Sequence, residues 1–225
     1  ENHIHFLKMC EHNCNTDDIA DMNTAEQILM NETFSIEKKM RALFYLRNII
    51  TDESADIISK ALFKNSSILL LHEICYVLGQ MRLEKSINFL ISILNNENFD
   101  IITRHEAAEA LGNYRKPELI KELIKFINYK EIPLRETCYI AIKKIKMTEK
   151  LVKEIELSQF NSRDPAIPLF KEFSEKNMNE SIDILKNSEC LYEKYRAMFF
   201  LRDFDEFLYN QGDLSNQGDS IKCDS

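Results

Sequence analysis

Two His-Glu dipeptides recur in matching local sequence. His72-Glu73 lies in the string LHEICYVLG, and His105-Glu106 lies 33 residues later in RHEAAEALG. The chain holds only five histidines, so two in one register are informative. Two histidines and one carboxylate, with coordination positions left open, form the ligand set of non-haem Fe(II) sites that activate oxygen. The pairs predict a metal site with His72, Glu73, His105 and Glu106 as its iron-binding set.

The same histidines have a structural alternative, in which they act as helix caps or make ordinary polar contacts. The flanking repeats favour the metal interpretation, because they carry Arg41-Ala42 and Arg135-Glu136 at the corresponding places. The repeat geometry therefore does not itself require histidine there.

The two pairs lie inside a longer internal repeat. The strings RALFYLR from Arg41, LHEICYVLG from Leu71, RHEAAEALG from Arg104 and RETCYIAI from Arg135 mark four units of about 30 to 33 residues. Each unit also carries a second apolar stretch at helical spacing, as in the residues Ile87, Leu90, Ile91 and Leu94. Two helices in each unit, stacked on their neighbours, predict an all-α fold, an α-solenoid of helical hairpins.

This architecture would bring the two pairs together. Neighbouring residues of a helix lie about 100° apart, so the imidazoles form one stripe along the inner face of the stack and the carboxylates form another. Packed helices lie about 8 to 10 Å apart, which lets imidazoles from both converge on one ion. Gly79 and Gly112 each follow a pair by seven residues and predict close helix approach.

Composition narrows the class of protein. The 225 residues include only four Gly and four Pro, which favours long helices with short connections. The formal net charge of -8 disfavours a nucleic-acid partner, and no apolar run is long enough for a membrane span. The first residues lack the pattern of a signal peptide, and six cysteines in a chain of this size are typical of reduced thiols. We expect a cytoplasmic protein.

We predict five segments along the chain. The string YRAMFFLR from Tyr195 repeats MRALFYLR from Met40 at an offset of 155 residues, which indicates the start of a second repeat half. The segments are a disordered N-terminal extension (1–23), a repeat half with both His-Glu pairs (24–158), a linker (159–168), the start of a second half (169–202) and a disordered tail (203–225).

The strings LLLHEICYVLGQM and TRHEAAEALG, with RALFYLRN before them, RETCYIAIKK after them and YRAMFFLRD opening the second half, resemble deoxyhypusine hydroxylase. The resemblance covers residues from about 24 to 202. It implies a HEAT-like solenoid of two pseudo-symmetric halves and O2-dependent hydroxylation of a deoxyhypusine side chain on the hypusine-bearing translation factor. The cofactor that it implies is a di-iron centre between the halves, with two Fe(2+) ions, and it assigns no catalytic residue beyond the metal ligands.

The resemblance also implies individual roles. His72 and His105 match the imidazoles that hold one iron, and Glu73 matches a carboxylate that reaches across to the other. Glu106 completes the second pair, more as a neighbour of the direct ligands than as one of them. Glu109, one turn after His105, matches a carboxylate that meets the cationic amine of deoxyhypusine; its alternative is a solvent-facing helix carboxylate.

The sequence departs from the resemblance in one respect. Four His-Glu pairs are expected, and the offset of 155 residues places the other two near 227 and 260, whereas the chain ends at Ser225. Three explanations are open: a truncated gene product, a homodimer in which two first halves rebuild the centre, or a degenerate solenoid that only binds a partner. The partial second half favours truncation. The chain opens on Glu1 instead of Met, so we expect either a trimmed chain or a fragment. The alternative function is a catalytically inactive protein-binding scaffold.

A second group of metal-binding residue types lies at the N terminus and consists of His3, His5, Cys10, His12 and Cys14. Their spacing matches no closed zinc site, so we expect this group to belong to the disordered extension. Cys75 and Cys138 occupy matching places in their repeats and are interpreted as small core residues.

Overall fold

The computed structural model describes residues 19–147 and 163–217, which are all helical or connecting segments without a β-strand. The chain divides into two compact units, Glu1–Ile145 and Lys146–Ser225. Each unit is described by itself.

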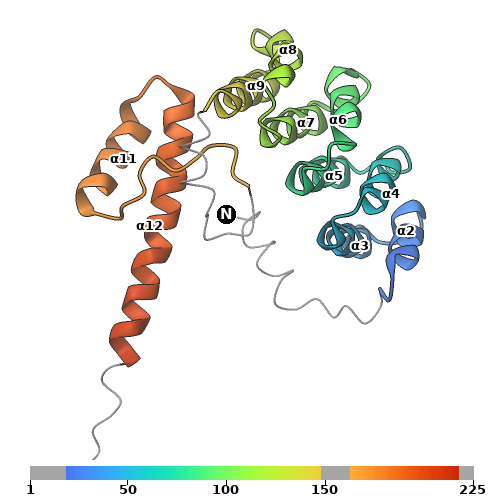
Figure 1. The fold of residues 1–225 in the computed structure, drawn as a ribbon, viewed down its shortest axis with the longest axis horizontal. Helices are drawn as coiled ribbons and strands as arrows, with labels where there is room; N and C mark the ends of the chain where they lie inside the picture. Colours follow the sequence, from blue (N-terminus) through green and yellow to red (C-terminus); the bar gives the residue numbers. More distant parts are fainter. Residues whose placement is uncertain (1–18, 148–162, 218–225) are drawn as a thin grey trace, which may run out of the picture. The chain divides into compact units, whose positions relative to one another are not determined.

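The first unit is a stack of helical hairpins (Figure 1). Its helices are α2 (Met22–Met30), α3 (Ile36–Ile49), α4 (Asp52–Leu62), α5 (Ile68–Met81), α6 (Ser86–Asn95), α7 (Ile101–Asn113), the short η2 (Pro117–Leu119), α8 (Ile120–Leu123) and η3 (Ile124–Phe126), and α9 (Ile132–Ile145). Helices α3, α5, α7 and α9 form one row, and the other helices of the hairpins form a second row beside it. This arrangement confirms the predicted all-α solenoid.

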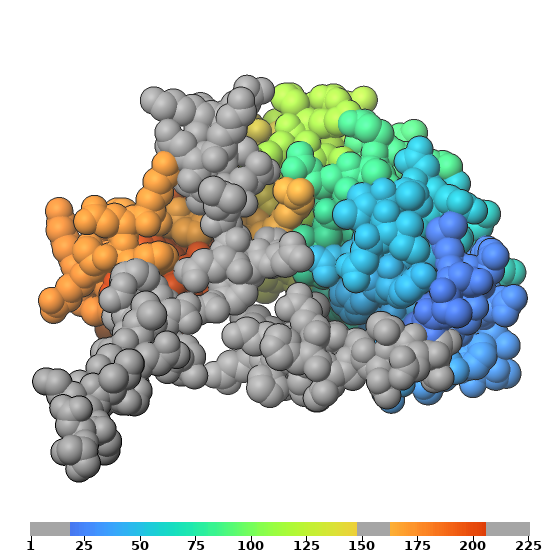
Figure 2. All heavy atoms as spheres, turned by 60° about the horizontal axis from the view of Figure 1, so that its bottom comes forward, coloured from blue at the N-terminus to red at the C-terminus, as the bar shows by residue number. Residues whose placement is uncertain are grey.

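Successive hairpins share one apolar core, and Figure 2 shows them following one another in sequence order on one face. Each hairpin contributes leucine and isoleucine side chains that no solvent reaches, among them Leu43, Leu46, Ile58, Ile74, Leu78, Leu90, Leu94 and Leu111. No unit could bury these faces alone, so stacking is what stabilises each hairpin. Cys75 and Cys138 are buried free thiols in this core, as predicted.

Capping side chains mark where the helices α3, α5 and α7 begin. The side chains of Ser35, Ser67 and Asp100 each accept a hydrogen bond from a backbone N–H in the first turn of α3, α5 and α7. Helices α3 and α5 end on Ile50 and Arg82, whose φ values of 48° and 55° are left-handed. Such positions usually hold glycine.

The described glycines instead lie inside helices, where they set the distance between neighbours. A Cβ atom added at Gly79 of α5 would lie 2.6 Å from the Cβ of Ala110 in α7. One added at Gly112 of α7 would lie 3.0 Å from the Cβ of Ala141 in α9. Close helix approach at both glycines is therefore confirmed.

The second unit contains α11 (Glu175–Asn187) and α12 (Leu191–Gln217), preceded by an irregular segment from residue 163 to 174. Phe170 and Phe173 of this segment pack on the buried Phe200 of α12, with ring centroids 5.4 and 5.7 Å apart. Arg202 donates hydrogen bonds to both carboxylate oxygens of Asp164 at 2.8 and 2.9 Å. The aromatic ring contacts and this ion pair tie the irregular segment to α12.

Two predicted segment boundaries differ from the structure. The first helix begins at Met22, before residue 24, because Asp21 caps it and Ile19 is buried beside it. Helix α12 continues through Gln217, so residues 203–217 are helical where a disordered tail was predicted. Phe204, which packs on Phe173 and Phe200, extends the apolar face of the helix beyond residue 202. Residues 1–18, 148–162 and 218–225 lie outside the described residues; the second of these ranges holds the end of the predicted repeat half and the first four residues of the predicted linker.

Candidate metal centre

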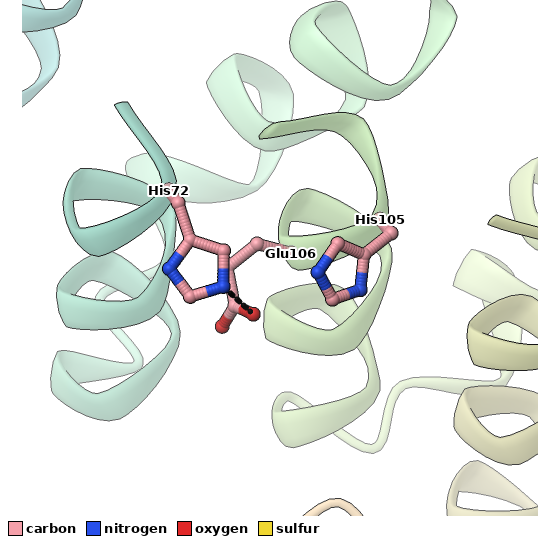
Figure 3. A group of neighbouring side chains, drawn as sticks. All are labelled: His72, His105 and Glu106. Atoms are coloured by element: carbon pink, nitrogen blue, oxygen red, sulfur yellow. Dashed lines mark ion pairs between the residues drawn. The ribbon is translucent and has the colours of Figure 1, made fainter. Parts of the chain in front are cut away.

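The two histidines occupy equivalent places on neighbouring helices. Helix α5 begins at Ile68 and α7 at Ile101, so His72 and His105 are each the fifth residue of their helix. The two helices pack directly against each other, and the imidazole centroids lie 5.6 Å apart (Figure 3). The structure thus brings the two histidines together, as their register predicts.

Glu106 contacts the imidazole of His72 and lies close to that of His105. Its Oε2 atom lies 3.0 Å from Nε2 of His72, and its residue is only 5% exposed. One possible ligand atom from each of His72, His105 and Glu106 lies within 4.8 Å of those of the other two. Within the described ranges, this is the one group of three such side chains close enough to share an ion.

Glu73 lies on a different side of the His72 ring. Its Oε1 atom is 3.2 Å from Nδ1 of His72, and its residue is 3% exposed. Rotation by about 100° from His105 to Glu106 turns the Glu106 carboxylate toward α5. Glu73 is not part of the three-residue group. The resemblance likewise implies that Glu73 reaches across to the other iron, and that role stays a prediction.

The buried carboxylates have opposite consequences for the two histidines. Burial lowers the pKa of His72, but hydrogen bonds and charges from Glu106 and Glu73 outweigh it and raise the pKa to about 10. Burial lowers the pKa of His105; the charge of Glu106 opposes this and that of His72 adds to it. In the protein without metal, His72 therefore carries a positive charge between Glu73 and Glu106. A metal cation would place positive charge at the same point, so the donor set fits a divalent ion.

Thr137 of α9 also belongs to the surroundings of the site, although the sequence did not predict it. Its Oγ1 atom lies 3.3 Å from Nδ1 of His105, so the fourth repeat also contributes to the site. Thr137 lies in the string RETC, 32 residues after His105. In the alignment of the repeats, Arg135 and not Thr137 corresponds to the histidines, so the register alone does not indicate Thr137.

Glu109 is half-buried and lies one turn beyond His105 on α7. Tyr76 lies one turn beyond His72 on α5, in the matching register. Burial raises the pKa of Tyr76 to about 12, Arg47 opposes the shift, and Glu73, Glu106 and Glu109 add to it. The phenol therefore stays protonated, and Glu109 is close enough to act on it electrostatically.

Other predicted features have different outcomes. Burial raises the pKa of the Cys75 thiol well above its usual value, and the charge of Glu106 adds to the shift, so this neighbour of the site remains a thiol. The N-terminal histidine and cysteine group lies outside the described residues. Among the helices that the structure describes, none has the length and apolarity to cross a membrane.

Comparison with known proteins gives relatives that share one name, deoxyhypusine hydroxylase. The chain is 36% identical over 200 residues to the deoxyhypusine hydroxylase of Debaryomyces hansenii, covering 83% of this chain and 64% of that protein. For the deoxyhypusine hydroxylase of Danio rerio the identity is 33% over 210 residues, covering 91% and 66%. The chain is a homologue of the deoxyhypusine hydroxylases.

A solved structure agrees with these sequence matches. The structure of human deoxyhypusine hydroxylase in complex with glycerol superposes with a TM-score of 0.74 and 32% identity, covering 81% of this chain and 62% of the human chain. The resemblance predicted from the repeated strings is thus confirmed. No protein-family model matches the chain. The chain spans less than two thirds of the length of these deoxyhypusine hydroxylases.

Proposed function

We propose that this chain is an iron monooxygenase of the deoxyhypusine hydroxylase type. Its reaction would add one oxygen atom from O2 to the deoxyhypusine side chain of the hypusine-bearing translation factor, which gives hypusine. The observation that supports this proposal is the buried group of two imidazoles and one carboxylate, in a chain homologous to enzymes of that name. The cytoplasmic location expected from the sequence is part of the same proposal.

His72, His105 and Glu106 are the residues that would hold Fe(2+). Two imidazoles and one carboxylate leave coordination positions open, and iron bound in this way supplies the capacity to activate O2. Glu73 is proposed to serve the second Fe(2+) of a complete centre, as the resemblance implies. Further ligands for that second ion would come from outside the described residues, and a homodimer, one of the three explanations open from the sequence, is one source.

The protein's own part in the chemistry is to hold this group away from water. Glu73 and Glu106 are almost wholly buried, and both histidines are half-buried. Burial strengthens the interactions among these groups and keeps their side chains in one arrangement. His72 gives up its proton when a cation binds, because an imidazole must be neutral to act as a ligand.

Glu109 is proposed to bind the cationic amine of deoxyhypusine. It lies one helical turn from His105, a rise of about 5 to 6 Å along the axis, which separates amine recognition from the metal group. Tyr76 in the neighbouring helix adds an aromatic ring and a protonated hydroxyl at the same level. A carboxylate next to an aromatic ring is a favourable environment for an ammonium group.

The scaffold alternative is not favoured by the site. A surface that only binds a partner has no need of two carboxylates buried around a histidine, because burying such charges costs free energy unless they are paired. The same residues are accounted for if the group exists to hold a cation.

Hydroxylation of the translation factor tests the proposal. The iron-loaded chain would be incubated with a reductant, O2 and the factor carrying deoxyhypusine, and the factor's mass would be followed for the gain of one oxygen atom. The Danio rerio relative is the positive control, and His72→Ala and His105→Ala variants should be inactive. Glu109→Gln should raise KM more than it lowers kcat. An iron-loaded wild-type chain that leaves the mass unchanged while the Danio rerio protein hydroxylates the factor would contradict the proposal.

A further inference from the structure

His105 is anchored by a hydroxyl from the next repeat. Its Nδ1 atom lies 3.3 Å from Oγ1 of Thr137, and both side chains are half-buried. Helix α7 packs directly on α9, which approaches closely because Gly112 has no side chain where Ala141 lies. The position of Thr137 beside His105 is therefore fixed by the packing of two helices.

The two ring nitrogens of His105 face different surroundings. With Nδ1 next to Thr137, the other nitrogen, Nε2, is directed toward Glu106 and His72 (Figure 3). A neutral imidazole has one N–H group and one lone pair, and only the nitrogen with the lone pair can bind a metal. The partner of one nitrogen thus decides whether the other is available.

His72 shows the same arrangement with a different partner. Its Nδ1 atom meets Glu73, and its Nε2 atom meets Glu106 at 3.0 Å. In both histidines Nδ1 contacts a side chain that can accept a hydrogen bond from its N–H group, and Nε2 faces the shared carboxylate. A carboxylate does this for one imidazole and a hydroxyl for the other.

We propose that Thr137 is a positioning residue that accepts the Nδ1–H of His105 and so reserves Nε2 for the metal. The inference rests on the proposed metal site, since Thr137 itself does not belong to the three-residue group. Partners that orient a histidine ligand typically change metal affinity by about 10- to 100-fold when they are removed.

The test compares three variants of the whole chain in anaerobic Fe(II) titrations. Thr137→Val keeps the size and removes the hydroxyl, and it should bind Fe(II) about 10- to 100-fold more weakly than wild type. Thr137→Ser restores a hydroxyl and should recover most of the affinity. Thr103→Val is the matched control, because buried Thr103 lies on α7 and its Oγ1 has no hydrogen-bond partner among the described residues. Its Fe(II) affinity should equal that of wild type.

A second readout separates this inference from the proposed function. Nitrogen-15 NMR of the metal-free protein should show His105 protonated on Nδ1 in wild type and Thr137→Ser, with the Nε2–H form increased in Thr137→Val. Thr137→Val with wild-type Fe(II) affinity, or a wild-type His105 protonated on Nε2, would overturn the inference. If the wild-type chain binds no Fe(II), the proposed function fails, and the NMR measurement still decides whether Thr137 fixes the proton.

Discussion

At the scale of the residue, His72 lies between two carboxylates, whereas His105 lies between a hydroxyl and the ring of His72. Burial of the carboxylates would be costly without a compensating charge. The metal-free protein meets that cost by protonating one histidine and keeping the other neutral. The metal-free site therefore contains a protonated His72 next to a neutral His105.

Metal uptake should release this proton. The pKa of His72 is raised to about 10, so at pH 7 the metal-free ring is protonated and binding of Fe(II) should expel about one proton. Titration calorimetry in two buffers of different ionisation enthalpy would measure the release. Equal heats in both buffers would contradict it.

The same shift has a defined effect on stability. The folded-state pKa lies above the ordinary value of 6.5, so the stabilisation is fully present below that pH and is lost as the pH rises toward about 10. The metal-free His72→Ala variant should lack this pH dependence of unfolding in urea.

The two carboxylates should differ in their importance for the first ion. Glu106 belongs to the group of possible ligands, while Glu73 lies outside that group and contacts the Nδ1 side of His72. Glu106→Gln should therefore weaken Fe(II) binding more than Glu73→Gln, whose effect should stay within the about 10- to 100-fold range of an orienting partner. The reverse order of affinities would show that Glu73 is the direct ligand.

Part of this site could be predicted from residues alone. Two histidines in one register on neighbouring repeats are enough to place His72 and His105 together, because parallel helices preserve register along the stack. The preference for Glu106 over Glu73 depends on which way each helix is rotated toward its neighbour. The contribution of Thr137 depends on how α9 packs against α7, which the pattern of residue types along the sequence does not predict.

At the scale of the element, helices α5, α7 and α9 owe their spacing to glycine. Gly79 and Gly112 lie toward the ends of α5 and α7, beyond the histidines. Glycine has a poor intrinsic helix propensity, so helix formation does not explain its presence there. The close contacts with Ala110 and Ala141 explain why a smaller residue is favoured at these positions. The same contacts keep α5 and α7 close enough for their imidazoles to meet.

Alanine at these two positions should have unequal effects. A Cβ at position 79 would come within 2.7 Å of the backbone Cα of Ala110, which cannot move aside without shifting the helix. Gly79→Ala should lower the free energy of unfolding by about 1 to 3 kcal/mol, as overpacking does. Gly112→Ala, with 3.1 Å to the Cα of Ala141, should be closer to neutral because its gain in helix propensity of about 1 kcal/mol offsets a milder contact.

Urea unfolding of the metal-free protein would compare the two substitutions. Equal stability losses would mean that the helices adjust their separation freely. Fe(II) affinity should also fall further in Gly79→Ala, since Gly79 separates the two helices that carry the histidines.

The elements were more predictable than their ends. Apolar residues repeating at helical spacing in four units predicted the hairpins, because each helix must bury one face against its neighbours. The end of α12 was not predictable in this way, since the stretch after residue 209 has almost no apolar periodicity. The middle of this helix is held by the packing of Phe204 on Phe173 and by the ion pair of Arg202 with Asp164, which are contacts between residues distant in sequence.

At the scale of the whole molecule, the described site lies within one unit. His72, Glu106, His105 and Thr137 all come from the stack that ends at Ile145. The relatives are longer than this chain, which spans less than two thirds of their length. We therefore expect this unit to hold the first iron by itself, since the possible ligands of that iron all lie on it.

The iron content of the chain tests that claim most directly. After anaerobic loading with Fe(II) and removal of free metal, iron per chain would be measured on the same sample as the mass in solution, which also reports a homodimer. We predict about one tightly held iron per chain in wild type and none in a variant combining His72→Ala with His105→Ala. A variant lacking His3, His5 and His12 should keep its iron. Background iron in wild type, or iron retained by the double variant, would contradict the account.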